Sequence, residues 1–221
     1  MNISYRLVII IAAFITCLIT ANTIAVKVVS LGPFNLPAAI FVFPLSYIFG
    51  DVLTEVYGYR MARKIIWLGF ACNLIFVFFA WIGQLLPAAE FWEGQEAYVS
   101  ILGYTPRLLA ASFCGYLAGE FVNSYILARM KIFTKGRWLW SRTIGSTVVG
   151  QGLDTSIFIT LAFIGTPVFA AIMILHHWFA KVAIEIICTP ATYAIVNWLK
   201  KREKIDYYDH ETRYNPFMIS D

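Results

Sequence analysis

Charged residues and catalytic motifs are both scarce in this sequence. Only 14% of the 221 residues are charged, whereas soluble domains carry about 25%. The chain has no HExxH zinc motif, no GxSxG nucleophile elbow and no phosphate-binding glycine loop. The main metalloprotease, hydrolase and nucleotidase classes therefore lack their parts. We expect no enzymatic activity, and we assign no catalytic residue, no metal site and no cofactor.

Cysteine is also sparse and shows no ligand spacing. The four cysteines each fall in a different apolar stretch, and none forms a CxxC pair: Cys17, Cys72, Cys114 and Cys188. Isolated cysteines of this kind pack as small hydrophobic residues. The sequence therefore predicts neither a disulfide framework nor a cysteine metal site.

Long uncharged runs dominate the chain instead. Residues 7–26 and 65–89 carry no charged side chain. About 20 apolar residues suffice to cross a hydrocarbon core of roughly 30 Å. The pattern predicts an all-α membrane protein, with a six-helix transmembrane bundle in residues 1–199 and a polar cytoplasmic tail in residues 200–221. The expected spans cover residues 5–28, 36–56, 62–86, 106–130, 142–165 and 168–199.

The basic residues orient this bundle. Of the 17 Lys and Arg residues, 14 fall on the side of the membrane that six spans assign to both termini. The positive-inside rule then predicts a multi-pass protein of the inner (plasma) membrane with both termini in the cytoplasm. The net charge of +4 is spread over short loops and the tail. It therefore indicates topology and a lipid bilayer as partner, and not nucleic-acid binding.

Four ionisable residues fall well inside the expected spans: Glu120, Asp154, Lys181 and Glu185. Facing lipid, they would together cost about 10–14 kcal/mol, so we expect them to point inward. Asn123 and Gln151 each stand three residues from one of the carboxylates. These six residues are the candidate substrate-binding set, and two carboxylate–amide couples are the arrangement that the spacing suggests.

Purely structural roles compete with binding at these positions. Lys181 and Glu185 stand four residues apart, a spacing typical of an intrahelical ion pair. Glu120 and Asp154 have no basic neighbour at helical spacing, which leaves an interhelical hydrogen bond, a protonated carboxyl or a ligand site. Ser146, Gly150 and Asp154 form one small and polar row, which we expect to face the protein interior.

Further polar residues lie nearer the ends of the expected spans. Asp51 and Glu55 stand one helical turn apart, just before Arg60 and Arg63. A surface salt-bridge network and a gate are equally good interpretations of that cluster. Asn22 and Lys27 in the first span are also candidates for gating or structural roles, and the Gly115–Gly119 GxxxG pattern predicts a close helix contact.

Five ordered motifs carry a family resemblance. They are ANTIAVK from residue 21, FPLSYIFGDVLTEVYGYRMARKIIWLGF from residue 43, ASFCGYLAGEFVNS from residue 111, GSTVVGQGLDTSIF from residue 145 and KVAIEIICTP from residue 181. Together they resemble the queuosine precursor transporter family, also described as vitamin uptake transporters. The resemblance covers nearly the whole chain from Tyr5 to Leu199.

This resemblance implies uptake of 7-deazaguanines, such as preQ0, preQ1 or queuine, across the inner membrane for salvage into tRNA modification. It also implies a six-helix bundle similar to the substrate-binding components of energy-coupling-factor transporters, working without an ATPase module as a secondary transporter or facilitator. A substrate-binding subunit that needs an ATPase-coupled partner is the alternative. The AxxxA pattern at Ala21 and Ala25 would then serve for docking.

The candidate residues suit such a ligand. A carboxylate accepts from the ring N1–H and the exocyclic amine of a 7-deazaguanine side by side, while an amide or lysine donates to O6. Phe43, Tyr47 or Tyr116 could stack on the flat ring. A membrane enzyme using Glu120, Asp154 and His177, or a purely structural scaffold, are the interpretations from other classes. The sequence leaves open a homo-oligomer, the preferred deazapurine and the coupling of transport to protons.

Overall fold

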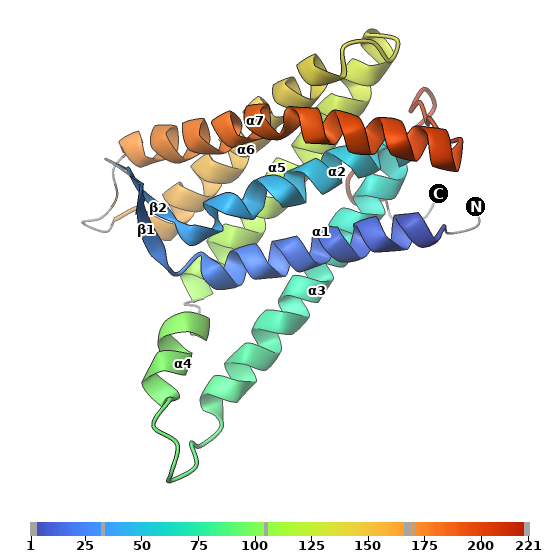
Figure 1. Ribbon diagram of the computed structural model, residues 1–221. Helices are drawn as coiled ribbons and strands as arrows, with labels where there is room; N and C mark the ends of the chain where they lie inside the picture. The colour runs from blue at the N-terminus through green and yellow to red at the C-terminus, as the bar shows by residue number, and fades with distance from the viewer. Residues whose placement is uncertain (1–3, 32–33, 104–105, 166–168, 170, 219–221) are drawn as a thin grey trace.

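The protein is helical apart from one short hairpin (Figure 1), in a computed structural model that describes residues 4–31, 34–103, 106–165, 169 and 171–218. In chain order the elements are α1 Tyr5–Ile24, β1 Val28–Leu31, β2 Phe34–Pro37, the 3-10 helix η1 Ala38–Phe41, α2 Phe43–Tyr57, α3 Tyr59–Leu85, α4 Gln95–Leu102, α5 Pro106–Phe133, α6 Leu139–Phe163 and α7 Ala171–Glu203. The two strands pair antiparallel, with Val28 opposite Pro37 and Leu31 opposite Phe34.

Within the described residues, six long helices occupy the six expected spans, but not all of them are apolar enough to be assigned as membrane-spanning by length and composition. In the described part of the chain, four segments are long and apolar enough to cross a membrane: Tyr5–Ile24, Ala38–Tyr57, Tyr59–Leu85 and Ala171–Glu203. The expectation of an all-α membrane protein is therefore confirmed at that level. The helices α5 and α6 fall outside this apolar set, although they contain 28 and 25 residues.

Some expected boundaries were wrong. The first span was expected to continue to Val28, but α1 ends at Ile24 and the chain turns into the hairpin. The second was expected from Leu36, which lies in β2 instead. A short helix, α4, forms inside the segment expected to be a loop between residues 87 and 105. The expected start of the last span at Val168 lies outside the described residues.

The helices α5 and α6 form the most extensive contact between any two elements. Glycines make this approach possible, because a Cβ added at Gly119 would lie 2.7 Å from the Asp154 Cβ and 3.0 Å from the Gly150 carbonyl oxygen. A Cβ at Gly115 would lie 2.8 Å from Asp154 Oδ1. The close contact predicted from the GxxxG pattern is confirmed, and it presses the Asp154 backbone against α5.

A second layer of helices, α1, α2 and α7, runs alongside this pair, whereas α3 leaves the bundle at an angle with α4 near its far end (Figure 1). The core between the layers contains Phe14 of α1, Val52 and Val56 of α2 and Leu199 of α7. The diverging half of α3 has large exposed apolar side chains: Leu74, Ile75, Phe78, Phe79, Trp81 and Leu85. Such an outer surface suits contact with lipid and not with water.

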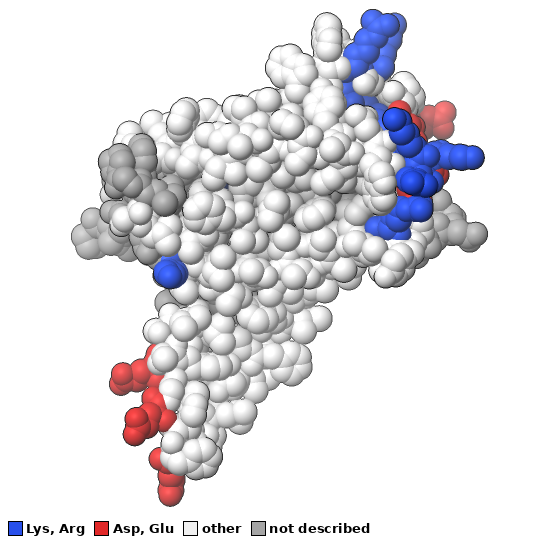
Figure 2. Space-filling model, viewed as in Figure 1, with Lys and Arg blue, Asp and Glu red and all other residues white. Residues whose placement is uncertain are grey.

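Charge is segregated along the molecule. In Figure 2, Lys and Arg side chains gather at the end where both termini lie, together with a few acidic ones. Acidic side chains project from the opposite extremity, beside α4, and the face shown between the two ends is almost uncharged. This distribution matches the one-sided basic pattern of the sequence.

The C-terminal tail packs against the body of the protein. The Asp209 carboxylate accepts hydrogen bonds of 3.0 and 3.1 Å from the Tyr59 amide. Arg63 donates to the Arg213 and Asn215 carbonyl oxygens, and Trp67 donates to the Pro216 carbonyl oxygen. Residues 204–218, called the strap below, thus lie along the first turns of α3.

Candidate functional site

A cavity of about 490 Å³ lies between α1, α2, α5, α6 and α7, near the hairpin end of the bundle. Volumes of this size are typical of small-molecule sites. Its walls are mostly apolar and aromatic, including Phe43, Tyr47 and Tyr116, which are the three aromatic residues expected to stack on a flat ligand. The polar side chains in its lining are Asn22, Ser46, Ser112, Glu120, Asp154, Thr155, His177 and Lys181.

Glu120 of α5 is the most deeply buried acid of the lining, with 1% of its surface exposed. Its Oε2 atom has no hydrogen-bond partner among the described residues. Gly50 of α2 makes room for this carboxylate, because a Cβ there would lie 3.2 Å from Glu120 Oε2. Glu120 therefore offers the cavity a buried hydrogen-bond acceptor that the protein itself does not use.

Asp154 and Lys181 form an ion pair across the cavity wall. Lys181 Nζ of α7 donates to Asp154 Oδ2 of α6 at 2.7 Å, and the ammonium lies 5.0 Å from the centre of the Phe43 ring. The alternative interpretation of Lys181 and Glu185 as an intrahelical ion pair is wrong, because the lysine pairs with Asp154 instead. The Gly115 and Gly119 contact brings Asp154 toward the interior, where its carboxylate meets the lysine of the neighbouring helix.

Three of the six candidate residues lie behind the cavity. Asn123, Gln151 and Glu185 are buried but do not line it. The expected carboxylate–amide couple of Glu120 and Asn123 does not form, because Asn123 Nδ2 donates to Asp51 Oδ1 of α2 at 2.7 Å. Gln151 Oε1 and both carboxylate oxygens of Glu185 have no hydrogen-bond partner within the described part of the chain.

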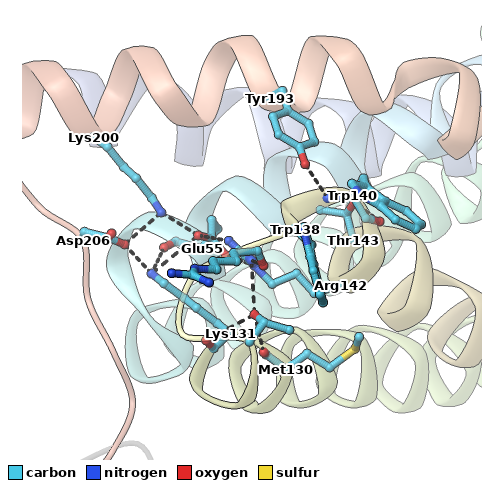
Figure 3. Close-up of polar contacts among 12 residues, drawn as sticks. Glu55, Met130, Lys131, Trp138, Trp140, Arg142, Thr143, Tyr193, Lys200 and Asp206 are labelled. Atoms are coloured by element: carbon cyan, nitrogen blue, oxygen red, sulfur yellow. Dashed lines mark hydrogen bonds and ion pairs between the residues drawn. The ribbon is translucent and has the colours of Figure 1, made fainter.

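A network of buried charges closes the other end of the bundle (Figure 3). Arg142 of α6 donates to both oxygens of Glu55, at 2.8 Å from Nε to Oε2 and 2.7 Å from Nη2 to Oε1. Lys200 of α7 donates to Glu55 Oε1 at 2.6 Å. Lys131 of α5 lies 3.6 Å from the same oxygen, and Asp206 of the strap accepts from Lys131 and Lys200 at 2.5 and 2.9 Å. We call these five residues the Glu55 network.

The interpretation of Asp51 and Glu55 as part of a surface network is wrong. Neither residue has exposed surface, and the basic partners of Glu55 come from α5, α6 and α7. The strap covers this end of the molecule, and Arg63 binds strap carbonyl oxygens. Burial would raise the pKa of the Asp206 carboxyl, but hydrogen bonds from Lys131 and Lys200 outweigh it and lower that pKa below its ordinary value.

Little in the sequence indicates this network, because the positive-inside rule already accounts for the positions of its basic residues. The one signal is Arg142, a cation in the first turn of α6. A positive charge there opposes the helix dipole, which indicates that the guanidinium is held by a carboxylate elsewhere.

The remaining candidates lie at the outer rim or inside the protein. Asn22 lines the cavity, and Lys27 is exposed in the turn after α1, where its carbonyl oxygen accepts from the Ala38 amide at 2.7 Å. Ala21 is completely buried and Ala25 lines the cavity. The AxxxA pattern therefore faces the interior, and the suggestion that it serves as a docking surface is wrong.

A match to a family model shows which family the chain belongs to. The family model described as "Putative vitamin uptake transporter" matches residues 37–195, a stretch that includes the cavity-lining Glu120, Asp154 and Lys181. The chain belongs to this family. The resemblance read from the five motifs is thereby confirmed.

Two proteins with similar sequences have more specific names. A protein of Bacillus subtilis (strain 168) named "Probable queuosine precursor transporter" is 32% identical over 193 residues, which cover 84% of this chain and 82% of the relative. The "Queuosine precursor transporter" of Escherichia coli (strain K12) is 26% identical over 88% of this chain and 84% of its own length. No solved structure matches the chain.

Proposed function

We propose that this protein takes up queuosine precursors, 7-deazaguanines such as preQ0, preQ1 or queuine, through the cavity described above. Membership of the vitamin uptake transporter family and the names of the two relatives support the substrate class. The observation that carries the proposal is the cavity of about 490 Å³ that joins aromatic walls to a buried carboxylate without a hydrogen-bond partner among the described residues.

Glu120 recognises the ligand by accepting hydrogen bonds from the edge that it shares with guanine. An ionised carboxylate is a pure acceptor, so it pairs with the N1–H and the exocyclic amine of the ligand side by side. Asp154 is occupied by Lys181, which leaves Glu120 as the free acceptor. A base without those two donors would bury Glu120 unpaired, and such a mismatch discriminates strongly between ligands.

The Asp154–Lys181 pair and the aromatic walls hold the rest of the ligand. Lys181 has three donor hydrogens and uses one toward Asp154, so it can also donate to the O6 of the base. Tyr47 and Tyr116 offer ring faces to the flat deazaguanine. The aminomethyl group of preQ1 is drawn to Asp154, whereas the nitrile of preQ0 needs no carboxylate.

The described state suits an outward-facing carrier. The six long helices all cross the membrane in this proposal, including α5 and α6, whose polar residues turn toward each other and the cavity. The basic end with both termini then faces the cytoplasm. The cavity lies toward the hairpin, and the Glu55 network seals the cytoplasmic end. Opening that network while the outer mouth closes would release the substrate inside.

The protein works alone in this proposal, as a secondary transporter or facilitator. The small-residue pattern of α1, the one feature that suggested docking to an ATPase module, faces inward. No other observation favours an energising partner.

Uptake by the purified protein tests the substrate assignment and the proposal that the protein works alone. Vesicles that contain only this protein should accumulate labelled preQ1 with saturation, and unlabelled preQ0, queuine and guanine should compete, whereas adenine should not. Failure of all deazaguanines to enter or to stabilise the folded protein thermally would remove the substrate assignment. Uptake that appears only with an added ATPase and ATP would instead support the subunit alternative.

A further inference from the structure

A buried carboxyl–amide pair lies behind the cavity wall and takes no part in its lining. Asp51 of α2 and Asn123 of α5 both have 0% exposed surface, and Asn123 Nδ2 donates to Asp51 Oδ1 at 2.7 Å. The remaining carboxylate oxygen, Asp51 Oδ2, and the amide oxygen, Asn123 Oδ1, have no hydrogen-bond partner among the described residues. The two planar groups thus make one hydrogen bond where such a pair can make two.

A second hydrogen bond between Asp51 and Asn123 needs one more hydrogen atom. An ionised Asp51 has only acceptor atoms, and so does the carbonyl side of the Asn123 amide. A proton on Asp51 Oδ2 turns that oxygen into a donor, and Asn123 Oδ1 is a buried acceptor on the residue that already binds Asp51. An acid and an amide can form a cyclic pair, in which the amide N–H donates to one carboxyl oxygen and the acid O–H donates to the amide oxygen. In that pairing a single proton supplies both unpartnered oxygens.

Three acidic side chains lie close enough to act on this pair. Glu185 of α7, Glu120 of α5 and Glu55 of α2 all act on Asp51 electrostatically. Glu185 is buried, and neither of its carboxylate oxygens has a hydrogen-bond partner within the described part. The helix α1 contributes the apolar Phe14 beside Gly50, and its one charged residue, Arg6, binds Glu203 at the far end.

The basic groups of the neighbouring helices are engaged elsewhere. Arg142, Lys131 and Lys200 bind Glu55 and Asp206, and Lys181 binds Asp154. The charged residues of α3 all lie in its first turns, on the side of the strap. Among the described residues, an ionised Asp51 would therefore have acidic neighbours and no cation of its own, so the site favours a bound proton or cation.

The ion favoured at this site is a proton and not a metal ion. Among the residues searched, no three His, Cys, Asp or Glu side chains are grouped so that they could hold a metal. One hydrogen can supply a partner to Asp51 Oδ2 and Asn123 Oδ1, which both lack one among the described residues. Glu120 both lines the cavity and acts electrostatically on Asp51.

We propose that the Asp51–Asn123 pair binds a proton that crosses the membrane together with the substrate. This makes the protein a proton symporter, and the inference rests on the proposed function. The proton enters from the cavity by way of Glu120, forms an O–H bond at Asp51 Oδ2, and leaves that oxygen toward the cytoplasm. No other bond forms or breaks.

Accumulation of labelled preQ0 by proteoliposomes tests the proposal, with the membrane potential clamped and the outside made acidic. For one proton per substrate, a gradient of about one pH unit sustains about a tenfold concentration ratio. The variant Asp51→Asn keeps the shape and mimics the permanently protonated acid, because its amide can pair with Asn123 in both directions. It should still exchange labelled for unlabelled preQ0, but it should no longer accumulate preQ0 in response to the gradient.

The exposed acid Glu96 supplies the matched control, since Glu96→Gln should accumulate preQ0 as the unaltered protein does. A measurement that needs no variant is external alkalinisation, because addition of preQ0 should remove about one proton per substrate from an unbuffered medium. Accumulation by Asp51→Asn equal to that of the unaltered protein, a sodium gradient as the only driver, or uptake without proton movement would overturn the proposal. Absence of any preQ0 exchange would overturn the proposed function itself, and this inference with it.

Discussion

The ammonium of Lys181 lies 2.7 Å from Asp154 Oδ2 and bridges α7 to α6 at the cavity wall. Only 11% of the lysine side chain and 13% of the aspartate side chain are exposed. The pair therefore joins two roles. It holds the two helices together, and it fixes a donor where a ligand carbonyl would sit.

Breaking this pair on one side should destabilise the protein. Asp154→Asn leaves the ammonium without its carboxylate, which we expect to cost about 3 kcal/mol of unfolding free energy, since removal of one partner of a buried pair costs 3–5 kcal/mol. The double variant with Lys181→Met should recover most of that loss, because no uncompensated charge remains. Thermal unfolding in detergent measures both. A double variant no more stable than Asp154→Asn would contradict the ion-pair explanation.

Much of the helical framework could be predicted, because a membrane span is a local property of the chain. Runs such as residues 7–26 are apolar over their whole length, and α1, α2, α3, α5, α6 and α7 lie where such runs or their polar equivalents were expected. The inward direction of Asp154 could be predicted as well. Lipid penalises a charge on any other face, and the row of Ser146 and Gly150 marks the contact side.

The partners of the charges could not be predicted, since they depend on packing between distant helices. The spacing of Lys181 and Glu185 allows an intrahelical pair, and only the close approach of α6 gives Lys181 to Asp154. Asp51 and Glu55 looked peripheral because basic residues follow them in sequence. Their partners come from α5, α6 and α7, 72 to 145 positions away along the chain, and show no periodic pattern.

Glu120→Gln tests ligand recognition. The amide presents a donor to the donors of a deazaguanine, so we expect about 10- to 100-fold weaker binding, the range for loss of hydrogen bonds to a charged group. Folding should be preserved, because Glu120 Oε2 has no partner among the described residues. Calorimetric titration with preQ0 gives the affinity, and exposed Glu96→Gln is the control. Equal affinities of Glu120→Gln and the control would exclude Glu120 as the acceptor.

Glu55→Gln should destabilise the Glu55 network more than any surface change. The carboxylate is bound by Arg142, Lys131 and Lys200, so its neutralisation leaves three crowded cations and should cost about 3–5 kcal/mol. Arg142→Lys keeps the charge but loses the two-point contact, and its cost should be intermediate. Chemical denaturation of the purified protein compares the two. A smaller loss for Glu55→Gln than for Arg142→Lys would contradict the central place of Glu55.

The stability should also depend on pH through Asp206. The pKa of this carboxyl is lowered in the folded protein, so its contribution is present above the unfolded value of 3.8 and disappears as pH falls through the folded value. Asp206→Asn should therefore be less stable than the unaltered protein at pH 6, and the difference should shrink as the pH falls below 3.8. The effect should be small, because the side chain is 43% exposed. Melting temperatures across this range measure it, and a constant difference would contradict the assignment.

Gly58→Ala should release the strap from α3. The Gly58 backbone has a φ of 86°, and a Cβ there would lie 2.3 Å from the Tyr207 ring. Gly165 is the matched control, because its φ is 78° but an added Cβ would have no atom of the described residues within 4 Å. Gly165→Ala thus measures backbone strain alone, about 1–2 kcal/mol, and Gly58→Ala adds the clash with the strap.

Limited proteolysis should separate these two effects. Cleavage within residues 204–218 should accelerate in Gly58→Ala and stay slow in Gly165→Ala, and Tyr207→Ala should partly restore the folding stability of Gly58→Ala by removing the clashing ring. Equal protease sensitivity of the two glycine variants would mean that the strap does not depend on the contact between Gly58 and Tyr207.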